Sequence, residues 1–183
     1  MRILITGASG SGTTTLGKSI ASKAGWNFVD ADDYYWLPTK PPYQSTRGHS
    51  ERLELILKEL DKNEYSVVSG SVMNWGSELE DSFDLVVFLY LDAEIRVPRL
   101  KVREEEELGH ADPEFLQWAA EYDIGPSQGR SLAKHETWLA ARNCKVIRIE
   151  GDLGTNERSE LLIKALPDQG GLLSRQGSQD TIP

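Results

Sequence analysis

A glycine-rich turn between a short apolar run and an amphipathic segment constrains the fold of this chain more than any other feature. Residues 7–14 read Gly-Ala-Ser-Gly-Ser-Gly-Thr-Thr. The β-branched run 2–6 before them is typical of a strand buried on both faces. After them, Leu16, Ile20 and Ala24 fall on one helical stripe. A strand, a glycine turn and a helix in this order predict the first unit of a parallel α/β sheet.

The rest of the chain repeats this alternation of strands and helices. Further strands are expected at 27–30, 66–69, 85–91 and 145–149. Helices are expected at 13–24, from Ser50 to about 60, from Asp92 to about 108, from Asp112–Pro113, at 130–142 and from about 156 to 166, with a loop at 34–48. This order predicts an α/β fold in which a five-stranded parallel sheet lies between two helical layers. Ligands bind at the carboxyl ends of the strands in such sheets.

Composition excludes several classes of protein. The chain has 183 residues, of which 39% are hydrophobic and 27% charged, so it can build a core and is not globally disordered. The formal net charge of -9 repels nucleic acid and anionic lipid, so neither partner is expected. No stretch approaches the roughly 20 apolar residues that span a bilayer. Cys144 is the lone cysteine, so no internal disulfide forms.

These observations predict a cytoplasmic domain over residues 1–166. The N-terminus reaches glycine too early for a signal peptide. Residues 167–183 are rich in Gly, Ser and Gln without periodicity, which predicts a disordered tail. Whether the domain is a monomer or a homodimer is left open.

The turn at 7–14 has the spacing of a phosphate-binding loop, with one departure. Four residues separate Gly7 from Gly12, and Thr13 stands where the pattern has lysine. Glycines let the backbone aim several N–H groups at one anion, and the helix N-terminus adds partial positive charge. Thr14 keeps the hydroxyl that ligates Mg²⁺. A plain strand-to-helix turn is the alternative. The expected nucleotide-binding residues of the loop are Gly7, Ser9, Gly10, Ser11, Gly12, Thr13, Thr14 and Thr15.

The missing lysine weakens catalysis unless another cation replaces it. Arg96, Arg99 and Arg103 are spaced to share one helical face after the strand at 85–91, which indicates a clamp for polyphosphate. The alternative is a solvated, salt-bridged face, because four consecutive glutamates follow at 104–107. Lys18 lies one turn into the first helix, but an exposed helix lysine is the commoner case.

An acidic pair follows the second expected strand. Asp30 and Asp32 lie at its carboxyl end, where one carboxylate can hold Mg²⁺ and the other can orient a nucleophile. Capping of the following loop or helix is the alternative, above all for Asp33. The aromatic residues 34–36 and Trp75 lie nearby and either stack on a ligand or pack the core. His49, His110 and His135 have no metal-ligand partners in the sequence pattern, so no zinc site is expected.

Together these segments resemble the small P-loop kinases, the superfamily of adenylate kinase-like, shikimate kinase-like and gluconate kinase-like enzymes. The resemblance covers roughly residues 1–166. It rests on the segments 7–14, 28–32, 67–70, 99–103, 130–135 and 149–152.

The resemblance implies a P-loop kinase fold with sheet order 2-3-1-4-5, ATP and Mg²⁺ as cofactors, and a helical lid at about 104–129. It places Arg99 and Gly151 at the adenine and Arg103 on the phosphates. Arg130 would contact the transferred phosphoryl group, and Gly70 would let the acceptor approach the backbone. Thr14 and Asp30 would serve Mg²⁺, and Asp32 the accepting hydroxyl. The catalytic set is therefore Asp32, Arg103 and Arg130.

Two classes of function follow. The first is an ATP-dependent phosphotransferase that acts on a small-molecule acceptor, either a nucleoside or nucleotide or a hydroxylated metabolite. The second is a nucleotide-binding regulatory module or slow ATPase that lost efficient transfer with the lysine.

Overall fold

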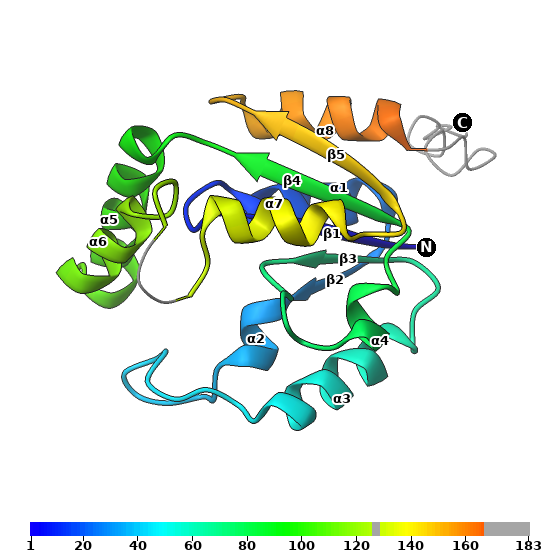
Figure 1. Cartoon of the computed structure of the whole chain (residues 1–183), viewed down its shortest axis with the longest axis horizontal. Helices are drawn as coiled ribbons and strands as arrows, with labels where there is room; N and C mark the ends of the chain where they lie inside the picture. The colour runs from blue at the N-terminus through cyan, green and yellow to red at the C-terminus, as the bar shows by residue number, and fades with distance from the viewer. Residues whose placement is uncertain (126–128, 167–183) are drawn as a thin grey trace, which may run out of the picture.

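The computed structural model describes residues 1–125 and 129–166, and its centre is one parallel sheet (Figure 1). The strands follow the order β2-β3-β1-β4-β5, which confirms the order that the resemblance implies. Their bounds are β1 Arg2–Gly7, β2 Asn27–Asp30, β3 Ser66–Ser69, β4 Leu85–Tyr90 and β5 Lys145–Glu150. Every pairing is parallel, so all five carboxyl ends lie at one edge of the sheet.

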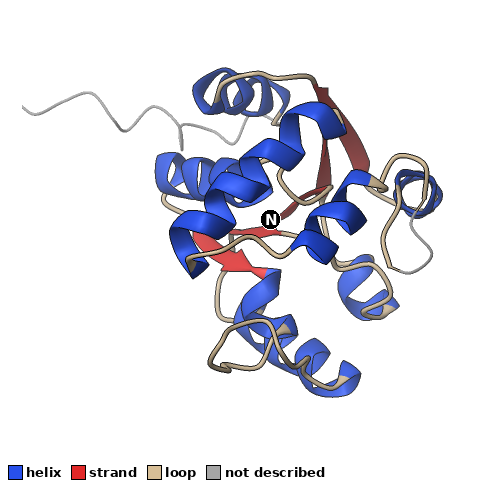
Figure 2. Ribbon diagram, turned by 90° about the vertical axis from the view of Figure 1, so that its left-hand side faces the viewer, coloured by secondary structure: helices blue, strands red, loops and turns tan. Residues whose placement is uncertain are grey.

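Helices cover both faces of the sheet, as Figure 2 shows. They are α1 Thr13–Ala24, α2 Ala31–Tyr35, α3 His49–Leu60, α4 Ser77–Glu80, α5 Ala93–Leu108, α6 Pro113–Ala120, α7 Leu132–Ala140 and α8 Thr155–Ala165. One core cluster packs α1 and α8 against the sheet, and the other packs α3, α4 and α7 against the opposite face. The three-layer architecture predicted from the sequence is confirmed.

The central strands are apolar on both sides because both of their faces are covered. In β4, Val86 and Phe88 belong to the cluster under α7, whereas Leu85, Val87 and Leu89 belong to the cluster under α1 and α8. All five side chains are at most 3% exposed. The continuous apolar run at 85–91 therefore reports burial on two faces, as expected for a strand inside a parallel sheet.

Some boundaries differ from the prediction. The expected loop at 34–48 begins with the end of α2, because the Asp30 carboxylate accepts a hydrogen bond from Asp32 N and starts a helical turn. The expected helix at 130–142 begins only at Leu132, where the Ser131 side chain caps it by accepting from Lys134 N. The helix expected from Ser50 begins at His49, and α4 was not predicted.

Two expectations fall partly or wholly outside the described residues. The predicted disordered tail, 167–183, lies outside them, and so do residues 126–128 of the predicted lid. Among residues 1–125 and 129–166, no helix is long and apolar enough to cross a membrane.

Candidate functional site

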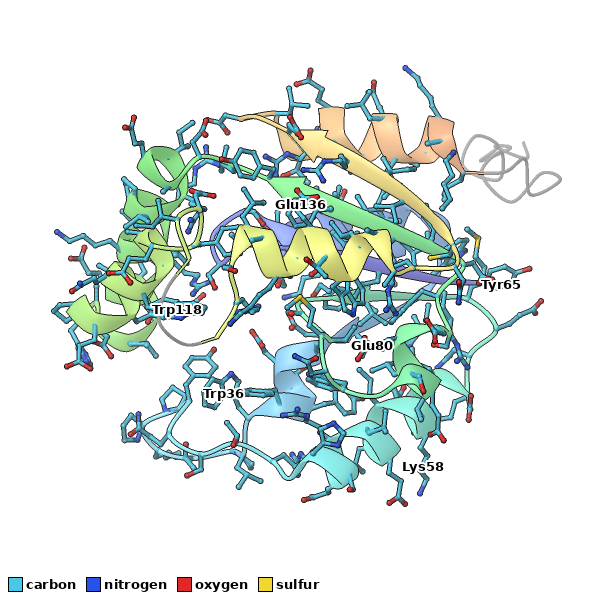
Figure 3. All side chains as sticks on the ribbon, in the orientation of Figure 1. Trp36, Lys58, Tyr65, Glu80, Trp118 and Glu136 are labelled. Carbon is cyan, nitrogen blue, oxygen red and sulfur yellow. The ribbon has the colours of Figure 1, made fainter. Side chains whose placement is uncertain are left out.

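One continuous cleft of about 2170 Å³ opens at the carboxyl edge of the sheet. Ligand pockets of proteins commonly hold about 300–1,000 Å³, so this space accommodates two ligands side by side. We call the part around residues 7–15 and 151–158 the nucleotide half. The part around Asp32, Arg52 and Trp75 is the acceptor half. Trp118 and Trp36 line the cleft from α6 and from the residue after α2, and Figure 3 shows them on opposite sides of the opening.

The loop of the nucleotide half is shaped by its glycines. Gly10 and Gly12 have φ of 83° and 92°, a region that favours glycine. A Cβ on Gly10 would also lie 2.8 Å from the Arg96 carbonyl oxygen, so α5 packs too closely for any side chain here. Within the loop, Ser11 N donates to the Ala8 carbonyl at 3.1 Å.

The N-terminus of α1 is open toward this loop. Among the described residues, no side chain caps it at Gly12. The N–H groups of the first helical turn, at residues 13–15, therefore have no partner within the helix. A helix N-terminus with free N–H groups behind a glycine loop fits a polyphosphate, which is the fit expected from the sequence.

Two side-chain oxygens that could ligate a metal ion lie close together beside the loop. Thr14 Oγ1 donates to Asp30 Oδ2 at 3.0 Å, and the other oxygen of Asp30 caps α2. Mg²⁺ prefers carboxylate and hydroxyl oxygens and keeps several waters. The donor set therefore fits Mg²⁺, and these two residues would hold it as the resemblance implies. No cluster of three or more His, Cys, Asp or Glu residues suitable for a metal occurs among the described residues.

Asp32 faces two arginines from different elements. Its side chain opens onto the cleft, yet protein surrounds it on most sides, and this desolvation raises the pKa of its carboxyl group. The positive charges of Arg130 and Arg103 act in the opposite direction and lower it. The structure thus brings together the three residues that the sequence predicted as catalytic.

The two arginines approach from α5 and from the segment before α7. Arg103 pairs with Glu104 at 2.8 Å and remains about half exposed to the cleft. Arg130 lies over the Trp118 ring at 5.5 Å and reaches Ser9 Oγ of the phosphate loop at 3.4 Å. Arg130 therefore connects the phosphate loop to the cleft wall that α6 forms.

The expected clamp of three arginines is wrong in one member. Arg96 is fully buried, donates to the Ala119 carbonyl oxygen and lies over the Tyr122 ring at 5.1 Å. It points into the contact between α5 and α6, away from the cleft. Spacing of i, i+3 and i+7 places residues on one broad face of a helix. Here one edge of that face, with Arg96, packs against α6, whereas Arg99 and Arg103 are about half exposed.

Arg99 joins α5 to the segment that follows β5. Its guanidinium donates to both carboxylate oxygens of Asp152, at 2.7 and 2.8 Å. Gly151, in the nucleotide half, precedes this aspartate with φ of 85°, and its carbonyl oxygen accepts a hydrogen bond from Arg158. The structure therefore brings Arg99 to the segment expected to contact the base.

The acceptor half is built from side chains of α2, α3 and the turn before α4. Tyr35 and Trp75 stack with ring centroids 6.2 Å apart. The Arg52 guanidinium lies 5.0 Å from the first ring and 4.8 Å from the second. No carboxylate pairs with Arg52 in residues 1–125 and 129–166, and its Nε is buried without a hydrogen-bond partner. A cation that lies over aromatic faces and has no carboxylate partner can accept an anion of a ligand.

Glu80 of α4 fixes the turn that carries Trp75. Its Oε1 accepts from Trp75 N at 3.0 Å and from Gly76 N at 3.1 Å. Its Oε2 accepts from Trp138 Nε1, and Arg142 lies 3.7 Å away. This carboxylate thus connects α7 to the wall of the acceptor half. Gly70, at the end of β3, has φ of 105° and lies close to Ala31.

Sequence reasoning missed Arg52, Glu80 and Arg158. Arg52 lies on α3, which was predicted, and Glu80 lies on α4, which was not. Both are far along the chain from the loop at 7–14, and no local pattern distinguishes them from surface residues. Arg158 lies one turn after the segment 150–155, which was expected at the carboxyl edge. That position is the one signal that could have found it.

Comparison with known proteins identifies the family. Residues 3–115, more than half of the chain, match the family described as an AAA domain. The chain belongs to this AAA domain family. The uncharacterized protein YqaC of Bacillus subtilis is 38% identical over 174 residues, which cover 90% of this chain and 96% of that protein. A probable gluconokinase of Xenopus tropicalis is 30% identical over 142 residues, covering 63% of this chain and 74% of that protein.

Structural comparison agrees on the fold of this AAA domain protein. A shikimate kinase from Acinetobacter baumannii superposes with a TM-score of 0.59 at 17% identity, covering 97% of this chain and 95% of the other. Relatives with a named activity are kinases. The chain is therefore a P-loop protein of the kinase type, as its sequence predicted.

Proposed function

We propose that the protein transfers the γ-phosphoryl group of ATP to a hydroxyl of a small acceptor that also carries an anionic group. The observation that carries this proposal is the position of Asp32. Its carboxylate is desolvated and interacts electrostatically with Arg103 and Arg130. The nearby Asp30 accepts a hydrogen bond from Thr14 of the phosphate loop. Phosphoryl transfer needs a base, cations and a phosphate-binding loop in this arrangement.

The proposed reaction uses Asp32 as the base. Asp32 accepts the proton of the acceptor hydroxyl while that oxygen bonds to the γ-phosphorus. The bond from this phosphorus to the β,γ-bridging oxygen breaks, and ADP leaves with the electron pair. Arg103 and Arg130 offset the negative charge of the transferred group. Thr14 and Asp30 would hold Mg²⁺, which would supply further charge neutralisation.

The proposed lid is the segment from about 104 to 129, which includes the end of α5 and all of α6. Arg103 directly precedes this segment, and Arg130 directly follows it. Closure of this segment over the cleft would exclude water, which otherwise competes with the acceptor hydroxyl.

Arg52 supports an anionic acceptor. Its unpaired guanidinium lies over two stacked aromatic rings and lines the same cleft as Asp32. A carboxylate or phosphate of the acceptor would satisfy it by a charge-assisted hydrogen bond. The relative named gluconokinase acts, by its name, on a hydroxylated carboxylic acid, which agrees with this chemistry.

The test is a screen for ADP formation with Mg²⁺ and ATP. Hydroxylated carboxylates form one panel, and uncharged nucleosides form the other. We expect turnover with a member of the first panel and a phosphorylated product in its mass spectrum. Arg52→Gln should raise the acceptor KM about tenfold or more without changing ATP affinity, because a bond to a charged group is lost. Lys58→Gln is the control, since Lys58 lies exposed on the same helix (Figure 3). Turnover with nucleosides alone would contradict the acceptor proposal.

A nucleotide-binding regulatory module or slow ATPase is the second candidate, and Thr13 favours it. The usual lysine supplies a charge at the β- and γ-phosphates. If Thr13→Lys raises the transfer rate strongly, the site is organised for transfer. If it leaves the rate near zero while wild-type protein binds ATP tightly, the regulatory module is the better function.

A further inference from the structure

Arg158 joins the phosphate loop to the segment after β5. It lies in the first turn of α8 and is 5% exposed. One guanidinium nitrogen, Nη1, donates to the Ser11 carbonyl at 2.7 Å, and the other, Nη2, donates to the Gly151 carbonyl at 2.8 Å. A single buried side chain thus holds together the two segments expected to bind phosphates and base.

The charge of this guanidinium is not compensated by an ion pair. No carboxylate lies within salt-bridge distance of Arg158 in residues 1–125 and 129–166, and its Nε is buried without a hydrogen-bond partner. The negative charge of Asp152 favours the charged form of Arg158, but this carboxylate forms its ion pair with Arg99. Burying an unpaired cation is unfavourable, so its place beside an anion-binding loop indicates an anion as its counter-charge.

Its contact also acts on the loop itself. A Cβ on Gly12 would lie 3.2 Å from Arg158 Nη1, so the guanidinium lies against the residue that precedes Thr13. The bond to the Ser11 carbonyl polarises the peptide whose N–H belongs to Gly12. Hydrogen bonds in a chain strengthen one another, so this N–H becomes a stronger donor.

We propose that Arg158 is a positioning residue that supplies, across the backbone of the loop, the fixed positive charge which the usual pattern places at position 13. This inference rests on the proposed ATP site and adds the residue that lets the site work with Thr13. Through Gly151, the same side chain keeps the segment 151–154 in place relative to the loop.

A charge acting on phosphates has a distinct signature. Its effect grows with the number of phosphates and is partly retained when Arg158→Lys keeps the charge, whereas a purely structural role, which depends on the two guanidinium hydrogen bonds, would be lost in Arg158→Lys as well as in Arg158→Gln. The experiment is therefore titration calorimetry of AMP, ADP and ATP, each with Mg²⁺, against wild type, Arg158→Gln and Arg158→Lys. Lys164→Gln is the matched control, because it removes one positive charge from an exposed position on the same helix.

We expect Arg158→Gln to weaken ATP binding at least about tenfold more than AMP binding, in line with bonds to charged groups. Arg158→Lys should retain part of the affinity, and Lys164→Gln should bind as wild type does. Thr13→Lys should raise ATP affinity by a larger factor in the Arg158→Gln background than in wild type, because the second cation then replaces the first.

An equal loss for AMP and ATP would overturn the inference, and so would an equal effect of Thr13→Lys in both backgrounds. If Arg158→Gln does not fold, as judged by its thermal transition, the same comparisons are made in a second neutral variant, Arg158→Met. Wild-type protein that binds no ATP would overturn the proposed function and this inference together. Tight wild-type binding with an unchanged Arg158→Gln variant overturns this inference alone.

Discussion

The two halves of the cleft are built by different means. The nucleotide half is mostly backbone: a glycine loop and the open N-terminus of α1, held from outside by Arg158. The acceptor half consists mostly of side chains: Asp32, an arginine that lies over two stacked aromatic rings, and a turn held by Glu80. Backbone recognises what all nucleotides share, whereas side chains can be exchanged to choose an acceptor. This division predicts that substitutions will separate the two binding functions.

Asp32→Asn should have the largest effect. We expect turnover to fall by about a hundredfold to ten-thousandfold, since a general base is removed, while ATP affinity stays unchanged. Calorimetry of ATP beside steady-state rates measures both. A parallel loss of ATP affinity would break the comparison, because it would mean that the halves share this residue.

The pH dependence of the same variant distinguishes chemistry from folding. Burial raises the pKa of Asp32, so wild-type turnover should rise with pH through a value above that of an ordinary aspartate. The raised pKa also means that Asp32 contributes stability at low pH, which is lost as pH rises through its folded-state pKa. Asp32→Asn should therefore be at least as stable as wild type at neutral pH, and its residual rate should lose the acidic limb.

Arg103→Ala should reduce turnover next most strongly. A cation aimed at the transferred group acts in the transition state, so we expect about a tenfold to hundredfold loss of kcat with a smaller change in ATP affinity. Lys101→Ala is the control, since this exposed residue lies on the same helix and pairs with Glu105. An unchanged rate with every working acceptor would remove Arg103 from the catalytic set.

Glu80→Gln should have the smallest effect and should be confined to the acceptor half. The change weakens the bonds to Trp75 N and Gly76 N, so the turn that carries Trp75 loosens beside Arg52. We expect the acceptor KM to rise about threefold to tenfold, and ATP affinity to remain as in wild type.

Asp81→Asn is the control for this substitution. It removes a neighbouring charge that pairs with the same Arg142 but does not contact the turn. An equal shift in both variants would mean that the ion pair with Arg142, rather than the turn, positions the acceptor half.

Much of the fold could be predicted from the sequence. Strand β4 is recognisable because burial on two faces demands an uninterrupted apolar run, and α6 because Asp112 and Pro113 begin it. The short α2 and α4 were missed, since one turn of helix has no periodicity to detect. The sheet order came from the resemblance to a family, because alternation alone does not fix which strands are neighbours.

The candidate site divides in the same way. The phosphate loop and the Asp30–Asp32 pair were predicted, because each follows a strand directly and carries its chemistry within a few residues. Arg96 was placed wrongly, since spacing does not say which side of a helix meets α6. The roles proposed for Arg52, Glu80 and Arg158 follow only from their tertiary contacts, which the sequence does not reveal.

The glycine turn at 7–14 and the helix that follows it could be predicted from the sequence, since glycine conformations and a helix start are local properties of the chain. Tertiary structure alone decided which cation lies behind that loop and which one remains unpaired in the acceptor half. The reason is that an arginine's role depends on its partners. Arg158 and Arg52 meet theirs across distances in the chain that no local pattern records.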